Sequence, residues 1–214
     1  MKLQKLGGYF CIVLVFVLVI MYVVSPILGF KPINRDADPV EAMNAFENYS
    51  FFFRIFSQIV AFFIAIFYIV LAMTLRERIQ SKAPNLMNFT VVAAIIAAIG
   101  TFYGSMINSS LMEAISQTKD VDSFNLVNGI RVGIASATIH AFGWVFLLTG
   151  VAAIKAKMLP KILRYLFLIF GIGNVLVFAI ESLGIINVLL SILTIIVLIW
   201  LGIYLIRNPE LNLE

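Results

Sequence analysis

Charged residues are scarce in this chain of 214 residues. Asp, Glu, Lys and Arg make up 12% of it, whereas a soluble domain carries about 25%. A water-soluble fold needs polar side chains over its surface, so this scarcity excludes a soluble globular domain. A hydrophobic share of 62% also excludes a disordered chain. With a mean hydropathy of +1.06, the composition indicates a membrane protein.

Cysteine and histidine are almost absent. The single Cys11 has no partner for an intrachain disulfide, and it excludes zinc or iron–sulfur sites built on several cysteines. The single His140 excludes a metal site built on several histidines. We therefore expect no metal and no cofactor. The net charge of +4 comes from short basic clusters between apolar runs. They form no aromatic and basic groove, so we expect no nucleic acid partner.

Six apolar runs are each about 20–24 residues long, enough to cross a ~30 Å hydrocarbon core at 1.5 Å per residue. They predict an all-α, polytopic transmembrane helical bundle that forms one integral membrane domain over residues 1–214. The first run lacks a cleavage site, so we expect a retained span and not a signal peptide. The predicted spans are 7–30, 55–75, 89–108, 131–154, 163–182 and 184–206, with outer loops at 31–54 and 109–130.

The distribution of charge predicts the orientation of these spans. Cytoplasmic loops of membrane proteins are enriched in Lys and Arg. If the N-terminus is cytoplasmic, ten of the fifteen basic residues fall inside and eight of the eleven acidic residues fall outside. Both termini are therefore predicted in the cytoplasm. The inner basic residues are Lys2, Lys5, Arg76, Arg78, Lys82, Lys155, Lys157, Lys161, Arg164 and Arg207.

Two helix-start signals lie in the outer loops. Asp38 precedes Pro39 and Glu41, which predicts a short helix with Asp38 as its N-cap. Ser110 stands three residues before Glu113, and this capping box predicts a second short helix that starts at Ser110.

Asp120 and Asp122 lie two residues apart before the fourth predicted span. Paired carboxylates occur in metal sites, but a pair beside Lys119 in a polar loop is typical of a solvated helix start. We therefore interpret Asp120 as the cap of that span.

The few polar residues inside the spans fall mostly toward their outer ends. Small residues accompany them at steps of three and four, which places them on one helical face. In span four this stripe comprises Gly133, Ser136, His140, Gly143, Leu147 and Gly150. Such faces allow helices to approach closely in lipid. The pattern predicts a polar cavity that opens to the outside and is lined by Gln58, Tyr103, Asn108, His140, Asn174, Glu181 and Asn187.

Each of these residues also has an ordinary structural explanation. An ionisable group within a span suggests function because its burial in lipid is costly. His140 could instead stay neutral and bond to a neighbouring helix, and Glu181 is close enough to the interface to be solvated. Asn174 and Asn187 are of the kind that form interhelical hydrogen bonds. No set of nucleophile, base and orienting group accompanies them, so no catalytic residue is predicted.

Three segments carry a resemblance to a known family. They are residues 140–150, residues 155–164 with the turn Leu159-Pro160, and Gly171-Ile-Gly173-Asn174. Together they resemble a family of bacterial six-span membrane proteins named domain of unknown function 4386. The resemblance implies about six helices with a Leu-Pro turn before a Gly-rich span. It implies no activity, and no site residue carries over.

The function expected from the sequence is non-enzymatic. We expect a module of the bacterial cytoplasmic membrane that lies in the lipid bilayer. Its outward cavity would bind a small hydrophobic or amphipathic ligand or a partner membrane protein. Two alternatives stay open: a small transporter or channel subunit, and an intramembrane enzyme that uses His140 and Glu181. The oligomeric state is left open.

Overall fold

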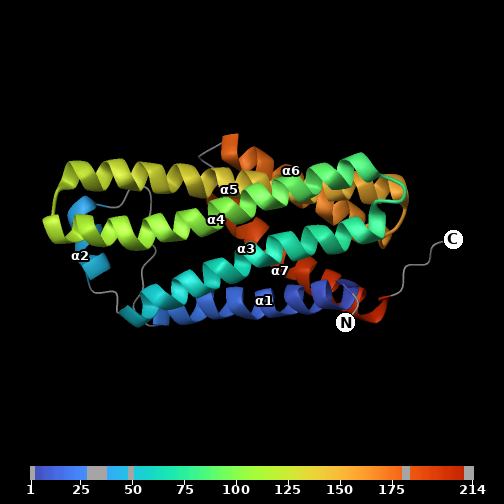
Figure 1. Ribbon diagram of the computed structural model, residues 1–214, viewed down its shortest axis with the longest axis horizontal. Helices are drawn as coiled ribbons and strands as arrows, with labels where there is room; N and C mark the ends of the chain where they lie inside the picture. The colour runs from blue at the N-terminus through green and yellow to red at the C-terminus, as the bar shows by residue number, and fades with distance from the viewer. Residues whose placement is uncertain (1–2, 28–37, 48–50, 180–183, 210–214) are drawn as a thin grey trace.

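The computed structural model describes residues 3–27, 38–47, 51–179 and 184–209 (Figure 1). Throughout this part of the chain the regular structure is α-helical, as the sequence predicts. The helices are α1 (Leu3–Ile27), α2 (Pro39–Glu47), α3 (Phe51–Ile79), α4 (Pro84–Thr118), α5 (Val121–Ala156), α6 (Lys161–Ala179) and α7 (Gly184–Arg207).

Four helical segments are long and apolar enough to cross a membrane. They are Leu3–Ile20, Ile55–Ile79, Pro84–Ile115 and Val121–Ala156 within the described residues, and Ile192–Arg207 is a shorter apolar stretch. This confirms an all-helical bundle with long apolar helices, as the sequence predicts. At 35 and 36 residues, α4 and α5 are each about 53 Å long, which exceeds the hydrocarbon core by about 20 Å.

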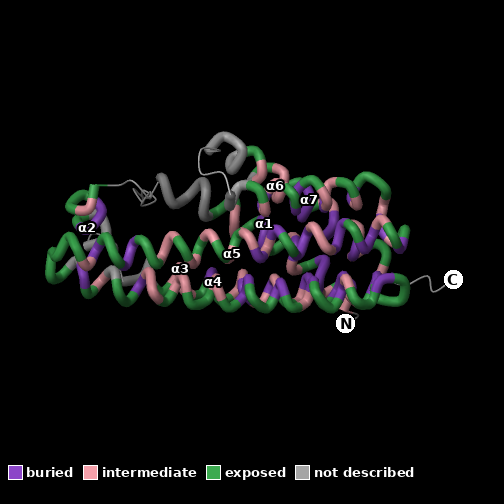
Figure 2. Tube along the Cα trace, turned by 90° about the horizontal axis from the view of Figure 1, so that it is seen from above, coloured by how far each residue is buried: buried purple, intermediate pink, exposed green. Residues whose placement is uncertain are grey.

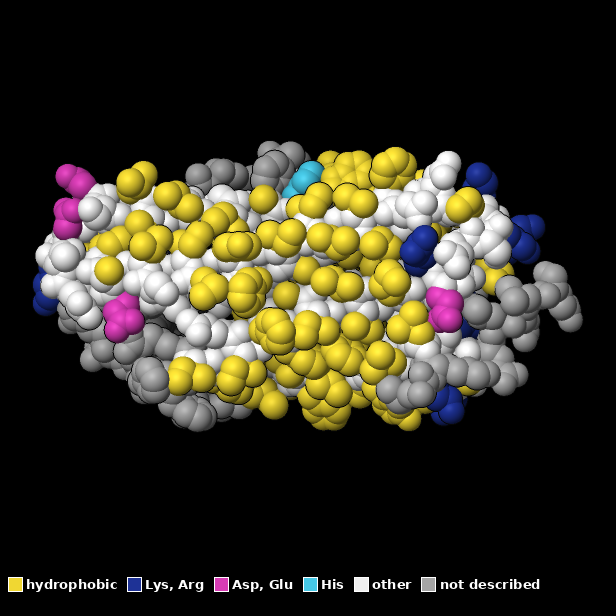
Figure 3. Space-filling model, viewed as in Figure 1, with side chains coloured by type: hydrophobic (Ala, Val, Ile, Leu, Met, Phe, Trp, Pro, Cys, Tyr) yellow, Lys and Arg dark blue, Asp and Glu magenta, His cyan; other side chains and the backbone are white. Residues whose placement is uncertain are grey.

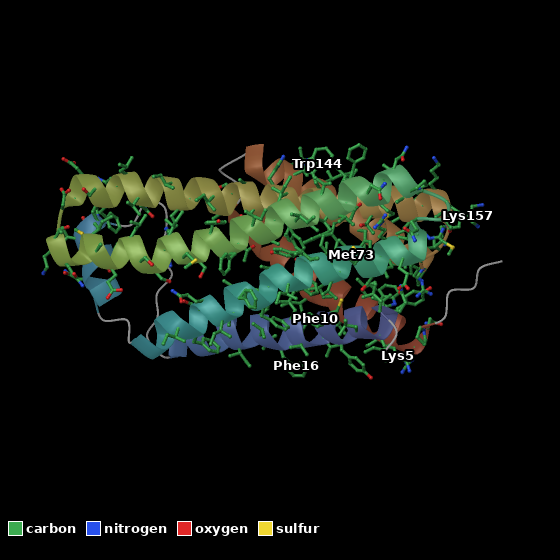
Figure 4. All side chains as sticks on the ribbon, viewed as in Figure 1. Lys5, Phe10, Phe16, Met73, Trp144 and Lys157 are labelled. Atoms are coloured by element: carbon green, nitrogen blue, oxygen red, sulfur yellow. The ribbon has the colours of Figure 1, made fainter. Side chains whose placement is uncertain are left out.

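The helices form a bundle in which α5 lies between α4 and α6. On the other side of α4, α3 packs against it, and α1 packs against both α3 and α7. Figure 2 shows that buried positions gather along the faces that the helices turn toward one another. Figure 4 shows Phe16 pointing away from the bundle, whereas Phe10 lies between α1 and α3 and stacks on Phe63 at 5.3 Å.

One prediction for the second outer loop is wrong. Ser110 does not start a helix, because α4 continues through it to Thr118 without a break. Lys119 ends α4 in the left-handed conformation (φ 54°), and Asp120 caps α5 directly afterwards. The segment 109–130 is thus a tight helical hairpin. Apolar residues such as Ile115 and Phe124 are buried on its inner faces, and this packing continues both helices beyond the predicted spans.

The predicted short helix at Asp38 is confirmed. The carboxylate of Asp38 accepts hydrogen bonds from the amides of Val40 (3.0 Å) and Glu41 (2.9 Å), so two of the open N–H groups at the start of α2 are satisfied. The helix then packs on the hairpin through Ala42 and Met43, both of which are buried.

Candidate functional site

Five of the seven predicted cavity residues have side chains that the structure describes. They come from four helices: Gln58 from α3, Tyr103 and Asn108 from α4, His140 from α5 and Asn174 from α6. Glu181 lies outside the described residues, as does the side chain of Asn187. The prediction that all seven line one cavity therefore stays a prediction, and the described residues show how far they are brought together.

His140 lies at the surface of the bundle, where Figure 3 shows it beside apolar side chains. Its Nε2 accepts a hydrogen bond from Nε1 of Trp144 one turn later (3.0 Å), and the two rings meet edge to face at 6.2 Å. The indole of Trp144 also lies at the outer edge of the bundle (Figure 4).

Asn174 is buried on α6 at a point where this helix packs closely against α5. Its Nδ2 donates to the carbonyl of Phe170 in its own helix (2.9 Å). A Cβ atom added at Gly143 would lie 2.9 Å from the Cβ of Asn174, so the glycine makes room for this amide. Gly143 follows His140 by about one helical turn, so His140 lies about one turn along α5 from the point of contact with Asn174.

The remaining predicted cavity residues with described side chains differ in how far they are exposed. Tyr103 is 59% exposed and projects from the surface of α4. Asn108 is half-buried, and its Oδ1 is buried without a hydrogen-bond partner among the described residues. Gln58 is also half-buried.

Sequence reasoning missed a polar layer on α4 and α5. Asn128 and Ser109 are buried there, at 7% and 6% exposure. Oδ1 of Asn128 accepts from Nε (3.0 Å) and from the terminal nitrogen (2.7 Å) of Arg131, while Ser109 donates to the carbonyl of Ser105. This layer lies between two separate hydrophobic cores. The small core beyond the layer is formed by Ala42, Met43, Ile115, Phe124 and Val127.

We call this small core and its helices the head. It consists of α2 and the ends of α4 (109–118) and α5 (121–130). Figure 1 shows that α4 and α5 extend beyond α1 and α3 at this end of the molecule. Ten further residues in each helix add about 15 Å. Spacing could have revealed the continuation of α4 into the head, because Ile107, Leu111 and Ile115 recur every four residues across the predicted end of span three at residue 108.

Charge divides the molecule between its two ends (Figure 3). The head and the adjoining polar layer carry five acidic side chains (Asp38, Glu41, Glu113, Asp120, Asp122) and two basic ones (Lys119, Arg131) among those described. The opposite end, which we call the basic end, carries Glu77 and nine basic side chains: Lys5, Arg76, Arg78, Lys82, Lys155, Lys157, Lys161, Arg164 and Arg207.

The interior next to the basic end is filled. Phe146 is 1% exposed and meets Phe170 at 4.6 Å, Phe142 at 4.7 Å and Phe167 at 5.1 Å between ring centroids. Further large side chains that are less than 2% exposed complete this core: Phe67, Leu71, Leu75, Ile79, Met87, Leu159 and Leu163.

A polar cluster at the basic end joins three helices. Arg78 of α3 is 7% exposed and donates to Oε1 of Gln4 in α1 (3.4 Å), to the hydroxyl of Tyr204 in α7 (3.2 Å) and to the carbonyl of Asn208 (2.9 Å). Its guanidinium also lies 4.7 Å from the centre of the Tyr204 ring. Nε2 of Gln4 in turn donates to Glu77 (2.9 Å). These contacts tie the first and last helices to α3.

At the head, the interpretation of Asp120 as a helix cap is confirmed. Its carboxylate accepts from the hydroxyl of Ser123 and from the amide of Asp122 (3.3 Å). These hydrogen bonds favour the ionised form, and the one from Ser123 contributes most to lowering the pKa of Asp120. No group of three His, Cys, Asp or Glu side chains that could hold a metal ion occurs in the described part of the chain.

Because the pKa of Asp120 is lowered, the stability of the first turn of α5 depends on pH. Because the pKa of Asp120 is lower in the folded state than in the unfolded state, its carboxylate stabilises the helix start above the ordinary carboxyl pKa. This stabilisation is lost as the pH falls through the folded value. We expect Asp120→Ala to speed amide hydrogen exchange at Asp122 and Ser123 at neutral pH. Asp120→Asn keeps a capping oxygen but does not titrate, so its exchange should lack this acid dependence. Equal profiles in all three proteins would contradict the cap.

No family model, curated protein or solved structure matches this chain.

Proposed function

We propose that this chain is a multi-pass integral membrane protein that acts as a non-enzymatic binding module. In this proposal α1, α3, α4, α5, α6 and α7 cross the bilayer, and both termini and the basic end face the cytoplasm. The charge division supports this orientation, because Lys and Arg are favoured on the cytoplasmic side. The head then projects about 15 Å from the outer surface.

The proposal depends on a contrast between the filled half of the bundle next to the basic end and the head at the other end. Large apolar side chains fill the half of the bundle next to the basic end, with Phe146, Phe167 and Phe170 each no more than 2% exposed. A transporter needs a polar route through that half, as well as discontinuous helices or charged groups near mid-membrane. The head, in contrast, presents helical surfaces of α2, α4 and α5 that lie beyond the predicted spans. The geometry therefore favours binding on the outer side over transport.

The alternative of an intramembrane enzyme, which the sequence left open, has less support. Nε2 of His140 accepts from Trp144, so this nitrogen is engaged within its own helix. A general base needs a nucleophile or substrate proton within about 3 Å. The resemblance to the six-span family stays a prediction.

Cysteine labelling tests the orientation. In a Cys11→Ala background, we expect a membrane-impermeant maleimide to label Asp122→Cys on intact cells and Lys157→Cys only after lysis. Both positions are exposed, Asp122 in the first turn of α5 and Lys157 directly after its last residue, so accessibility reports the side of each end of this helix. Labelling of Lys157→Cys on intact cells would overturn the orientation.

Flux measurements test the function itself. Proteoliposomes with the purified chain should release trapped K⁺ or a small anionic dye no faster than protein-free vesicles. As a matched variant, Phe146→Ala opens the filled core. If the unaltered chain itself releases K⁺ or dye, and if enlarging core residues reduces this release, the transport alternative is favoured and our proposal is contradicted.

A further inference from the structure

The face of α5 that packs against α6 continues toward the head, and no described residue packs close to Gly129 or Gly133 on that continuation. A Cβ atom at Gly150 would lie 2.7 Å from a backbone nitrogen of α6, and one at Gly143 would lie 3.0 Å from another. The described part of α6 ends at Ala179. Further along the same face, a Cβ at Gly133 or Gly129 would meet no atom within 4 Å. The α5–α6 interface therefore has an open continuation.

Large apolar side chains flank this open stretch. Leu126 is 68% exposed, more than any other large hydrophobic side chain that the structure describes, and Ile130 is 46% exposed. Positions 126, 129, 130 and 133 follow a step of three or four residues, so they share one face of α5. Leu126 also belongs to the head, where lipid would not cover it in the proposed orientation.

Acidic residues accompany this face at the head. Asp122 lies one turn before Leu126 and is exposed, as is Asp120 directly before α5. With five acidic and two basic described side chains, the head end has a negative excess. A partner that covers an apolar face next to this excess gains from Lys or Arg on its own polar side.

We infer that this face, formed by Asp122, Leu126, Gly129, Ile130 and Gly133, docks a cationic amphipathic helix of a partner on the outer side. The two glycines let the backbone of the incoming helix approach closely, as Gly143 and Gly150 do for α6. Its apolar residues cover Leu126 and Ile130, and its basic residues lie beside Asp122. From Asp122 to Gly133 the face covers about three helical turns.

A second copy of the chain does not have this complementarity. It presents the same acidic head, so two copies that meet at this face bring like charges together. The basic residues of a copy lie at the opposite end of the molecule, across the bilayer in the proposed orientation (Figure 3). The inference thus rests on the proposed outward orientation of the head.

The probe for the test is a fluorescent Lys/Leu amphipathic peptide of about 18 residues, a helix of about 27 Å. We measure its anisotropy with the full-length protein in phosphatidylcholine nanodiscs, which carry no net lipid charge. Gly133→Leu is expected to raise the Kd at least about tenfold because it fills the space that the helix needs. Leu126→Ser should also weaken binding. Asp122→Asn should weaken it less and reduce its salt dependence.

Matched controls separate this face from the rest of the head. Leu111→Ser removes a 44% exposed apolar side chain from α4, and Glu41→Gln removes an acidic group from α2. Binding to both should equal that of the unaltered protein, and a Glu/Leu peptide should not bind. Equal binding to Gly133→Leu and the unaltered protein would overturn the inference. A dimer cross-linked through Gly133→Cys would also overturn it, because a second copy would then cover the face. Binding that appears only after the substitutions Lys31→Gln and Arg35→Gln would overturn it as well, because it would indicate that a segment of this chain occupies the face.

The result is distinguishable from a failure of the proposed orientation. Labelling of Asp122→Cys and Lys157→Cys reports the side of the head without any peptide. If labelling places the head outside and Gly133→Leu has no effect, the docking inference alone is wrong.

Discussion

Replacement of Arg78 with alanine is expected to lower the free energy of unfolding by about 3 kcal/mol, because its charged hydrogen bonds are buried. The truncation leaves Oε1 of Gln4 without its donor at a position that is 1% exposed. It also removes the guanidinium from the Tyr204 ring and from the carbonyl of Asn208. Since these contacts join α1, α3 and α7, the loss should appear as earlier release of the two terminal helices.

Two variants make the Arg78 result specific. Arg78→Lys keeps the charge but cannot donate in the fork geometry that reaches three acceptors on two helices, so it should recover only part of the loss. Lys82→Ala removes an exposed charge from the same end and should change stability by less than about 0.5 kcal/mol. The measurement is unfolding in mixed detergent micelles followed by circular dichroism, with hydrogen exchange over residues 3–20. If Arg78→Ala and Lys82→Ala are equally stable, the cluster does not hold the helices together.

Gly150→Leu is expected to prevent normal packing of α6 against α5. A Cβ at this position would lie 2.7 Å from the backbone nitrogen of Leu168 and 3.1 Å from its Cα. Backbone atoms cannot rotate away as a side chain can, so the two helices must separate along their interface. Overpacking of a core commonly costs about 1–3 kcal/mol, and a clash with backbone belongs at or above the upper end of that range.

The matched control lies on the same face of the same helix. Gly133→Leu adds the same side chain where nothing lies within 4 Å, and replacing a helical glycine removes a backbone entropy cost. We therefore expect Gly133→Leu to be as stable as the unaltered protein or slightly more stable in the same detergent unfolding measurement. Equal destabilisation by both variants would show that glycine at these positions matters for reasons other than the approach of α6.

The two glycines also show where sequence pattern stops being informative. Spacing places Gly133, Gly143 and Gly150 on one predicted stripe, and nothing in the sequence distinguishes them. The structure shows α6 against Gly143 and Gly150, while Gly133 has open space around it. The difference arises because the described residues of α6 pack beside Gly143 and Gly150, whereas no described residue packs at Gly133. A stripe predicts that a face can be approached closely, and the placement of the neighbouring helix decides where.

The predicted site divides in the same way. The sequence predicts that His140 and Asn174 line one cavity, and the structure places Asn174 against Gly143, about one turn of α5 from His140. It also exposes Tyr103 and pairs His140 with Trp144, which depth alone could not indicate. Which way a polar side chain points around a helix depends on which neighbours the helix has, and these are long-range contacts.

The sequence by itself determined the helical, apolar character of this chain, its caps at Asp38 and Asp120, and the division of charge between two ends. These properties follow from composition, local hydrogen bonding and the period of the helix, each of which acts over a few residues. Only the tertiary structure decided that 109–130 is a projecting head, that Arg78 joins the terminal helices and that half of a glycine stripe stays open. Those features depend on contacts between residues far apart in the chain, as between Gln4, Arg78 and Asn208.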